Sequence, residues 1–338
     1  MNFRTFFALL SGGQLKVLGT LGKVARDYHR VAFLAAGLSS GWLQRLTSGP
    51  VAFDTLVAGL KIDRAMHDGL KAWLQLGVAL GELGLTPDGY VASGKISRMF
   101  TDPKNDAAAA FVEELAYLHN SLITQAPERL RNGQFFTLGD QDARMIARSS
   151  RLAEPFICEA LAGVVPKNGP FNLLEIGCGA AAYIRAAALR NPELTALGID
   201  LQAGAATLAT ENIAGWGLNS RVAIEVGDIR KRRAEAAFDL ATLHQNIYYF
   251  PVAERVGLLS HVRSFLKKGG QVLLTTICQG GGSTSAILDL WGSMTADCGR
   301  LPAPAEMVAQ IEKAGFIDVT ATRLIPGESF YSFAGTNR

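Results

Sequence analysis

The sequence predicts an α/β protein, with a doubly wound, largely parallel sheet in its C-terminal half and a mainly α-helical N-terminal part. Two observations favour this fold class. Short apolar runs alternate with helical patterns from about residue 170 onward, which is typical of a parallel sheet covered by helices. The first of these runs ends in a glycine turn, Gly177-Cys178-Gly179, that leads into an alanine-rich stretch. The length of 338 residues suits two domains.

Each element of the C-terminal half follows from a local pattern. The run at Leu173, Leu174 and Ile176 is too short for a helix and predicts a buried strand. Expected strands lie near residues 172–176, 195–200, 222–226, 239–243 and 271–277, and expected helices near 181–190, 202–215, 252–266 and 303–314. Residues 267–270, Lys-Lys-Gly-Gly, are expected to end a helix before the fifth strand. Residues 317–323 and 329–335 predict a terminal hairpin.

The N-terminal part predicts two helices, a turn and a short strand. Residues 53–60 form the first expected helix, and residues 68–85 place apolar side chains mostly at helical spacing. Pro87-Asp88-Gly89 then turns the chain into a strand at Tyr90. This order is that of a winged-helix-like unit. Its second helix has few basic residues, with only Lys71 near its start, so DNA binding is not favoured.

Charge and cysteine usage limit the partners that we expect. A net charge of +3 is small for this length, so nothing demands a nucleic acid partner. The basic run at residues 230–233 is predicted to be a solvated loop. The four cysteines are widely spread without a C-x-x-C pair, and we expect free thiols in a reducing cytoplasm and no metal site. They are Cys158, Cys178, Cys278 and Cys298.

The first residues raise the question of targeting. An apolar stretch from Phe6 to Leu10 is interrupted at residues 11–14 before it reaches signal-peptide length. No run of about 20 apolar residues follows, so we expect neither a membrane span nor a membrane partner. Residues 1–45 alternatively predict an amphipathic helical arm that packs on a partner subunit.

The glycine turn predicts a nucleotide-cofactor site. Gly177 and Gly179 lack Cβ atoms, so they can adopt positive φ and let a ligand lie against bare backbone. Asp200 ends the next apolar run, and its carboxylate can accept both hydrogen bonds of a ribose diol. Leu201, directly after it, is expected to contact the same cofactor.

Three details favour S-adenosylmethionine over a dinucleotide, although a dehydrogenase would use the same strand, turn and helix. Ala182 replaces the third glycine of the dinucleotide fingerprint. Glu175 would repel a pyrophosphate but can bind the ammonium of S-adenosylmethionine, which also carries a positive sulfonium. Asp228 closes a further strand and can reach the adenine amino group, with Ile229 packed against the ring.

These motifs resemble those of the class I S-adenosylmethionine-dependent methyltransferases over about residues 150–338. The resemblance rests on Glu175-Ile-Gly-Cys-Gly179, Asp200, Gly227-Asp228-Ile229 and residues 238–244, in this order. It implies a Rossmann-like doubly wound methyltransferase sheet. The N-terminal part is similar to the winged-helix-like dimerisation domain of small-molecule O-methyltransferases, including residues 80–85 before a Gly-Tyr wing.

The resemblance also implies a division of the chain and a homodimer. Residues 1–100 are expected to be the dimerisation domain, residues 101–160 a helical connector that lines the substrate pocket, and residues 161–338 the domain that binds S-adenosylmethionine. The expected partners are a small-molecule acceptor and a second copy of the chain.

His244 is the predicted general base. Methyl transfer is an in-line displacement, so a hydroxyl acceptor must also lose a proton. In the resembled O-methyltransferases a Leu-His-Asp-Trp phrase supplies a basic histidine, and Leu243-His244 matches its first half. Imidazole titrates near neutral pH, which suits this role. Gln245-Asn246 replaces Asp-Trp, and Thr276 lies near the position expected for the carboxylate that orients the histidine. His244 could instead cap its strand or contact the cofactor.

These departures leave other acceptors open. An amine, a carboxylate or an activated carbon can be methylated by proximity and desolvation with little help from a base. Residues 246–249 are loosely similar to the Asn-Pro-Pro-Tyr loop of amine and base methylators, without its prolines. A winged-helix regulator that only senses the cofactor is the alternative outside the enzymes, and it would need a basic recognition helix.

Three apolar residues are candidates for contact with the acceptor. Trp291 and Met294 belong to a predicted helix over residues 287–294 that follows a glycine run and could form a mobile roof, although a packed core helix fits equally well. Tyr248 is the third candidate. The expected acceptor is a small, aromatic or apolar metabolite with a hydroxyl group.

Overall fold

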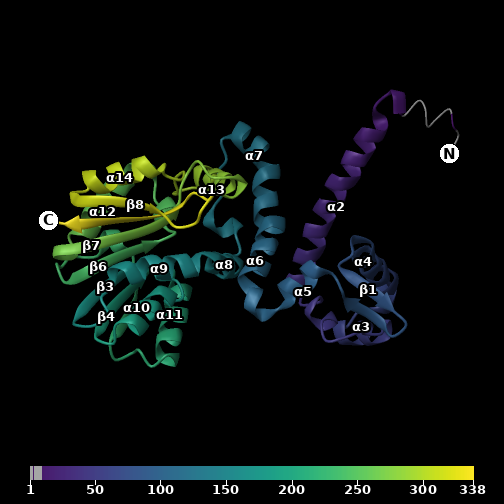
Figure 1. Cartoon of the computed structure of the whole chain (residues 1–338), viewed down its shortest axis with the longest axis horizontal. Coiled ribbons are helices and arrows are strands. Elements are labelled where there is room, and N and C mark those ends of the chain that lie inside the picture. The colour runs from purple at the N-terminus through teal and green to yellow at the C-terminus, as the bar shows by residue number, and fades with distance from the viewer. Residues whose placement is uncertain (1–2, 4–9) are drawn as a thin grey trace. The chain divides into compact units, whose positions relative to one another are not determined.

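We describe a computed structural model of the chain that covers residue 3 and residues 10–338 (Figure 1). Most of the apolar stretch from Phe6 to Leu10 therefore lies outside the described residues. The chain folds into two compact units. The N-terminal unit contains the chain up to Ser121 together with Gln141–Leu152, and the C-terminal unit contains Leu122–Asp140 and Ala153–Arg338. This division splits the expected connector, and the three functional domains stay a prediction.

The N-terminal unit is mainly helical. Its elements are α2 (Gln14–Ser39), α3 (Phe53–Leu60), α4 (His67–Leu80), β1 (Leu83–Thr86), β2 (Gly89–Ala92), α5 (Lys95–Thr101), α6 (Asp106–Glu114), the π-helical turn Leu115–His119 and α8 (Ala143–Ser149), with short 3₁₀ turns at Gln44–Leu46, Arg64–Met66 and Pro103–Asn105. The helix over residues 53–60 is confirmed.

The predicted helix over residues 68–85 is too long. It ends at Leu80, because Gly81 takes a left-handed conformation with φ of 78° and closes the helix. Leu83–Thr86 then pairs antiparallel with Gly89–Ala92, so a two-stranded hairpin follows the helix. The apolar residues near position 85 therefore belong to a strand. A short apolar run does not reveal whether its residues follow the period of a helix or of a strand. The likeness to a winged helix stays a prediction.

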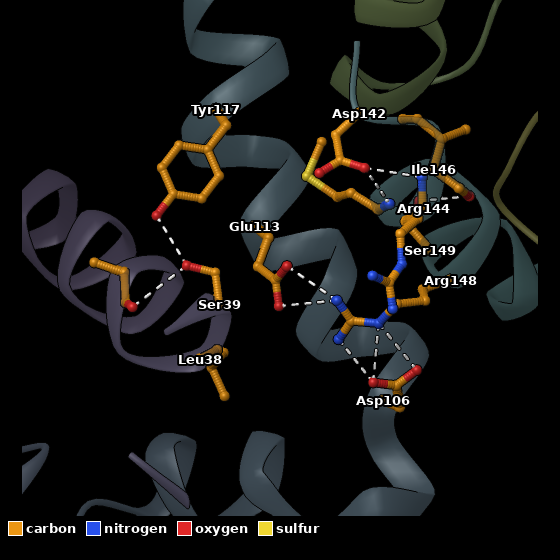
Figure 2. Close-up of polar contacts among 12 residues, drawn as sticks. Leu38, Ser39, Asp106, Glu113, Tyr117, Asp142, Arg144, Ile146, Arg148 and Ser149 are labelled. Carbon is orange, nitrogen blue, oxygen red and sulfur yellow. Dashed lines mark hydrogen bonds and ion pairs between the residues drawn. The ribbon is translucent and has the colours of Figure 1, made fainter. Parts of the chain in front are cut away.

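Arg148 joins two helices of this unit, as Figure 2 shows. Its guanidinium lies between the carboxylates of Asp106 and Glu113 on α6, with nitrogen to oxygen distances of 2.7 Å and 3.0 Å. Arg148 itself belongs to α8, whose first turn is capped by the side chain of Asp142. Two carboxylates on one planar guanidinium fix the approach of α8 to α6.

The C-terminal unit contains a seven-stranded sheet in the order β5-β4-β3-β6-β7-β9-β8. The strands are β3 (Phe171–Ile176), β4 (Leu194–Asp200), β5 (Val222–Val226), β6 (Phe238–His244), β7 (Leu266–Ile277), β8 (Phe316–Arg323) and β9 (Phe330–Asn337). The first five are parallel, and β8 and β9 form the antiparallel hairpin at one edge. The predicted α/β sheet and its terminal hairpin are confirmed.

Helices are present at each of the four positions predicted near residues 181–190, 202–215, 252–266 and 303–314, with one correction. The helices of this unit are α7 (Asn120–Asn132), which begins before the unit does, α9 (Glu154–Val164), α10 (Ala182–Arg190), α11 (Ala203–Gly215), α12 (Arg255–Arg263), α13 (Ser283–Met294) and α14 (Pro304–Lys313), with 3₁₀ turns at Leu138–Asp140, Ile229–Lys231, Ile247–Tyr249 and Val252–Glu254. A further 3₁₀ turn, Ser150–Ala153, lies mostly in the N-terminal unit. The predicted stop at residues 267–270 is wrong, because α12 ends at Arg263 and these four residues already belong to β7.

Alternate residues of the central strands pack against helices on opposite faces of the sheet. Leu174 and Leu243 share a core with α12 and α14, whereas Leu173 and Leu240 share a core with α9, α10 and α11. Figure 1 shows α12 and α14 on one side of the strands and α10 and α11 on the other. Because side chains alternate along a strand, Glu175 and His244 lie on the face covered by α10. Among the residues that the structure describes, none of the helices has the length and hydropathy needed to cross a bilayer.

Candidate cofactor and acceptor site

The predicted site residues of three strands meet at one edge of the sheet. β3 lies between β4 and β6, all three strands are parallel, and their carboxyl ends are therefore neighbours. Gly177 and Gly179 have φ values of 68° and 53°, so both need the conformational freedom of glycine. A Cβ on Gly177 would lie 2.6 Å from Asn246 Nδ2, which is too close. This edge is where open α/β sheets bind ligands.

Asp200 is tied to the glycine turn. Its Oδ2 accepts a hydrogen bond from the Gly179 amide at 2.9 Å, and its Oδ1 accepts one from the Gln202 amide at 2.9 Å. Each carboxylate oxygen keeps a second lone pair, so both can still accept the hydroxyls of a ribose. Leu201, next in the chain, is exposed. Two backbone amides thus fix the orientation of the carboxylate.

Glu175 is the most unusual group of the site. Its side chain is 1% exposed, and neither carboxylate oxygen has a hydrogen-bond partner among the described residues. Burial raises the pKa of Glu175 to about 8; the nearby backbone amide of Ile184 acts in the opposite direction, and the negative charge of Asp200 adds to the rise. A buried carboxylate without a partner is costly, and a bound cation would relieve the cost. The residue therefore fits the predicted ammonium of S-adenosylmethionine.

His244 ends β6 in a buried position. Its Nδ1 lies 2.9 Å from Thr275 Oγ1, and the buried Nε2 has no partner among the described residues. The ring of Tyr183 contacts it edge-on, with 4.7 Å between the ring centroids. Burial lowers the pKa of His244 to about 3, because the protonated ring would lose its hydration. The predicted neighbour Thr276 is wrong: the register pairs His244 with Thr275.

Asn246 is a polar residue of this edge that sequence reasoning considered only as part of a loop. Its Nδ2 donates to the Ile176 carbonyl at 2.6 Å, while its buried Oδ1 has no partner among the described residues. Gln245 precedes it with φ of 51°, a left-handed conformation that is unusual outside glycine. The polar pair Gln245-Asn246 at the end of an apolar strand is the only signal in the sequence.

Asp228 and Ile229 follow β5, where the sequence places the adenine. Ile229 is buried. Arg230 donates to both oxygens of Asp228, and this interaction holds the pKa of Asp228 below its usual range. Arg230 also donates to Glu254 at 3.1 Å. Arg230 is exposed, as the predicted solvated basic run requires, but it is also paired with two carboxylates, and an adenine amino group at Asp228 would share the carboxylate with this guanidinium.

Two of the three acceptor candidates lie together. Trp291 of α13 packs edge-on against Tyr248, with ring centroids 5.9 Å apart, and also against Tyr249 at 5.3 Å. Trp291 and Tyr248 are buried in this arrangement. Met294, also buried, ends α13, and its carbonyl accepts a hydrogen bond from the Phe136 amide at 2.7 Å. The sequence offers no spacing rule that connects Tyr249 with Trp291.

Comparisons with known proteins agree with this geometry. Residues 174–272 match the family described as methyltransferase domain. Demethylspheroidene O-methyltransferase of Rhodobacter capsulatus is 24% identical over 197 residues, which are 56% of this chain and 48% of that protein. The matched segment thus spans about half the length of this relative.

Solved structures resemble the chain over nearly its whole length. Mitomycin 7-O-methyltransferase MmcR has a TM-score of 0.79 at 15% identity, with 96% of this chain and 99% of that chain covered. Human N-acetylserotonin methyltransferase in complex with S-adenosylmethionine has a TM-score of 0.72 at 16% identity, with 95% and 97% covered. At this identity, the likeness establishes the fold.

Proposed function

We propose that the chain, whose residues 174–272 match the methyltransferase domain family, uses S-adenosylmethionine to transfer a methyl group to a hydroxyl oxygen of a small aromatic or apolar molecule. One observation carries the cofactor assignment: Glu175 is a buried carboxylate without a partner, two residues before the glycine turn. The choice of oxygen is supported by the names of the relative and of the structural neighbour described above.

Different residues would bind different parts of the cofactor. Glu175 would hold the ammonium, Gly177 and Gly179 would allow close approach, and Asp200 and Leu201 would hold the ribose. Asp228 and Ile229 would hold the adenine. When bound, the cofactor supplies a methyl group on a positively charged sulfonium. The contribution of the protein is then alignment and exclusion of water, because the displacement needs the acceptor in line with the methyl carbon.

The acceptor side would be formed by Tyr248, Trp291 and Met294. Trp291 and Tyr248 form an aromatic pair, and a wall built on such rings would suit an apolar or aromatic acceptor. We propose His244 as the group that receives the hydroxyl proton, through its unpartnered Nε2. A pKa of about 3 makes a protonated His244 costly, so we expect alignment to contribute more than proton removal.

The low pKa of His244 favours a second candidate within the same enzyme class. Acceptors that need little base, such as an amine, a carboxylate or an activated carbon, would be methylated by proximity alone. The two candidates differ in their response to His244→Gln. A hydroxyl acceptor that needs the base should lose activity strongly, whereas these acceptors should keep most of it.

A methyl-transfer screen tests the proposed function. The purified protein is incubated with S-adenosylmethionine and, in turn, with phenols, aliphatic alcohols, amines and carboxylates, and the products are identified by mass spectrometry. We expect a mass increase of one methyl group on a hydroxyl compound. Methylation restricted to amines or carboxylates would support the second candidate, and no turnover with any class would leave the cofactor-sensing regulator.

We also propose a homodimer through the N-terminal unit. Exposed apolar side chains, Val17, Leu21, Val24 and Tyr28, recur every three or four residues along one face of α2. A face of this kind is typical of a helix that packs on a partner. Sedimentation velocity should show a dimer for the wild-type chain and a monomer for the double variant Leu21→Asp, Val24→Asp. A wild-type monomer would contradict the proposal.

A further inference from the structure

The amide of Asn246 has a defined orientation. The Ile176 carbonyl is an acceptor only, so the atom 2.6 Å from it must be the amide nitrogen. The opposite atom, Oδ1, is consequently turned away from this carbonyl. It is buried and has no partner among the described residues. A buried acceptor without a donor indicates that a ligand supplies one.

The position of Asn246 limits what that ligand can be. Its Nδ2 occupies the space beside Gly177, where a Cβ would come within 2.6 Å. Glu175, two residues before Gly177 in the chain, offers two further buried oxygens without a partner among the described residues. A carboxylate and an amide oxygen both accept hydrogen bonds, so any single group that binds both must be a donor, and the carboxylate favours a positive charge. A primary ammonium has three donors and meets both conditions.

We propose that Asn246 binds the ammonium of the cofactor through Oδ1 while its Nδ2 fixes the turn at Ile176 and Gly177. This inference rests on the proposed function. It assigns Asn246 as a further cofactor-binding residue, alongside Glu175. It also implies that the protein discriminates for ligands that keep the amino-acid end of the cofactor.

Two ligands separate this role from a purely structural one. S-adenosylhomocysteine and 5′-methylthioadenosine share the adenosine and the thioether, but the second lacks the amino-acid end. A hydrogen bond to a charged group is among the stronger ones in proteins. We therefore expect Asn246→Ala to weaken S-adenosylhomocysteine at least tenfold and 5′-methylthioadenosine less than threefold, both measured by calorimetric titration.

Asn212→Ala is the matched control. Asn212 Nδ2 donates to the Ala180 carbonyl of the same glycine loop at 3.1 Å. Its loss removes a similar side-chain to backbone bond, so both ligands should weaken by the same factor. Thermal melting checks that each variant folds, and Asn246→Ser replaces Asn246→Ala if the latter does not.

The remaining outcomes would overturn the proposal. Equal weakening of the two ligands by Asn246→Ala would show that the residue only shapes the turn. Unchanged affinity for S-adenosylhomocysteine, with a raised KM for an amine acceptor, would place Oδ1 on the acceptor instead. If the wild-type chain bound no S-adenosylhomocysteine, the proposed function itself would fail, and this result is distinct from either of the others.

Discussion

Asp200 accepts a hydrogen bond from the amide of Gly179, with 2.9 Å between Oδ2 and the nitrogen. The carboxylate proposed to hold the ribose is therefore also part of the turn that approaches the cofactor. The two parts of the predicted site, 21 residues apart in the sequence, are joined by one contact. A substitution at Asp200 should consequently act on both.

This double role predicts a graded response at Asp200. Asp200→Ala removes the ribose acceptor and the bond to Gly179, and we expect the affinity for S-adenosylhomocysteine to fall more than 100-fold, the order expected for loss of charge-assisted bonds. Asp200→Asn keeps one acceptor oxygen for the Gly179 amide, so its loss should be smaller, about tenfold. Equilibrium dialysis measures both. Equal losses of affinity in the two variants would show that the hydrogen bond to Gly179 does not contribute to cofactor binding.

Glu175 predicts that cofactor binding depends on pH. With a pKa of about 8, this carboxyl group is mostly protonated at pH 7 in the free protein, and a bound ammonium favours the ionised form. The affinity for S-adenosylhomocysteine should therefore rise between pH 6 and pH 8, by at most about tenfold per pH unit, with release of a proton. Calorimetry in buffers of different ionisation enthalpy measures the proton. Glu175→Gln should remove the release, and its persistence in that variant would exclude Glu175 as the source.

Glu175 also predicts that its replacement by glutamine stabilises the cofactor-free protein at alkaline pH. Its folded pKa is raised above the ordinary value of 4.5, so its stabilising contribution is present below about pH 4.5 and is lost as the pH rises to about 8. At pH 8.5, Glu175→Gln should raise the Tm of the cofactor-free protein by a few degrees, since about 1 kcal/mol corresponds to about 2–4 °C for a domain of this size. At pH 4 the two proteins should melt alike. A lower Tm for the variant at pH 8.5 would show that the buried carboxylate has a stabilising partner.

The low pKa of His244 predicts that protonation of this residue does not lower kcat on the acidic side of neutral pH. Because its pKa is lowered to about 3, the ring is neutral throughout the range from pH 5 to pH 8. Its titration should therefore cause no fall of kcat near pH 6.5. If His244 is the base, His244→Ala should lower kcat by about 10²–10⁴-fold while cofactor affinity is kept. Full activity of the variant would eliminate the general-base role, and a wild-type limb near pH 6.5 that His244→Ala abolishes would contradict the low pKa.

The aromatic contact of Trp291 predicts an effect on the acceptor alone. Trp291→Phe keeps an aromatic ring beside Tyr248 but removes part of the packing surface. We expect a higher KM for the acceptor, with unchanged affinity for S-adenosylhomocysteine. Leu189→Phe, at an exposed position of α10, serves as a control that should change neither. If Trp291→Phe lowered only the affinity for the cofactor, α13 would not line the acceptor site.

The alternation of apolar runs and helical patterns is sufficient to predict the order of strands and helices along the chain. Parallel strands that are buried on both faces leave a strong signal of this kind. Glu175, Gly177 and Asp200 are predictable for the same reason, because each lies in or directly after the last residues of such a strand. The end of α4 is not, because Leu83 and Leu85 fit a helix and a strand equally well.

The partners of the site residues could not be read from the sequence. Which threonine lies beside His244 depends on the register of β6 and β7, and an irregularity near Phe238 shifts that register. The pairing of Arg230 with Asp228 depends on a 3₁₀ turn that the basic run conceals. The burial that lowers the pKa of His244 is likewise a property of the packed helices and not of its neighbours in the chain.

The most direct test of the central claim is a calorimetric titration of the purified protein with S-adenosylmethionine, S-adenosylhomocysteine and NAD, beside the Asp200→Ala variant. We expect micromolar binding of the first two ligands, loss of that binding in the variant and no binding of NAD. Binding of NAD, with no response to the other two, would contradict the proposed methyl transfer and leave only the fold.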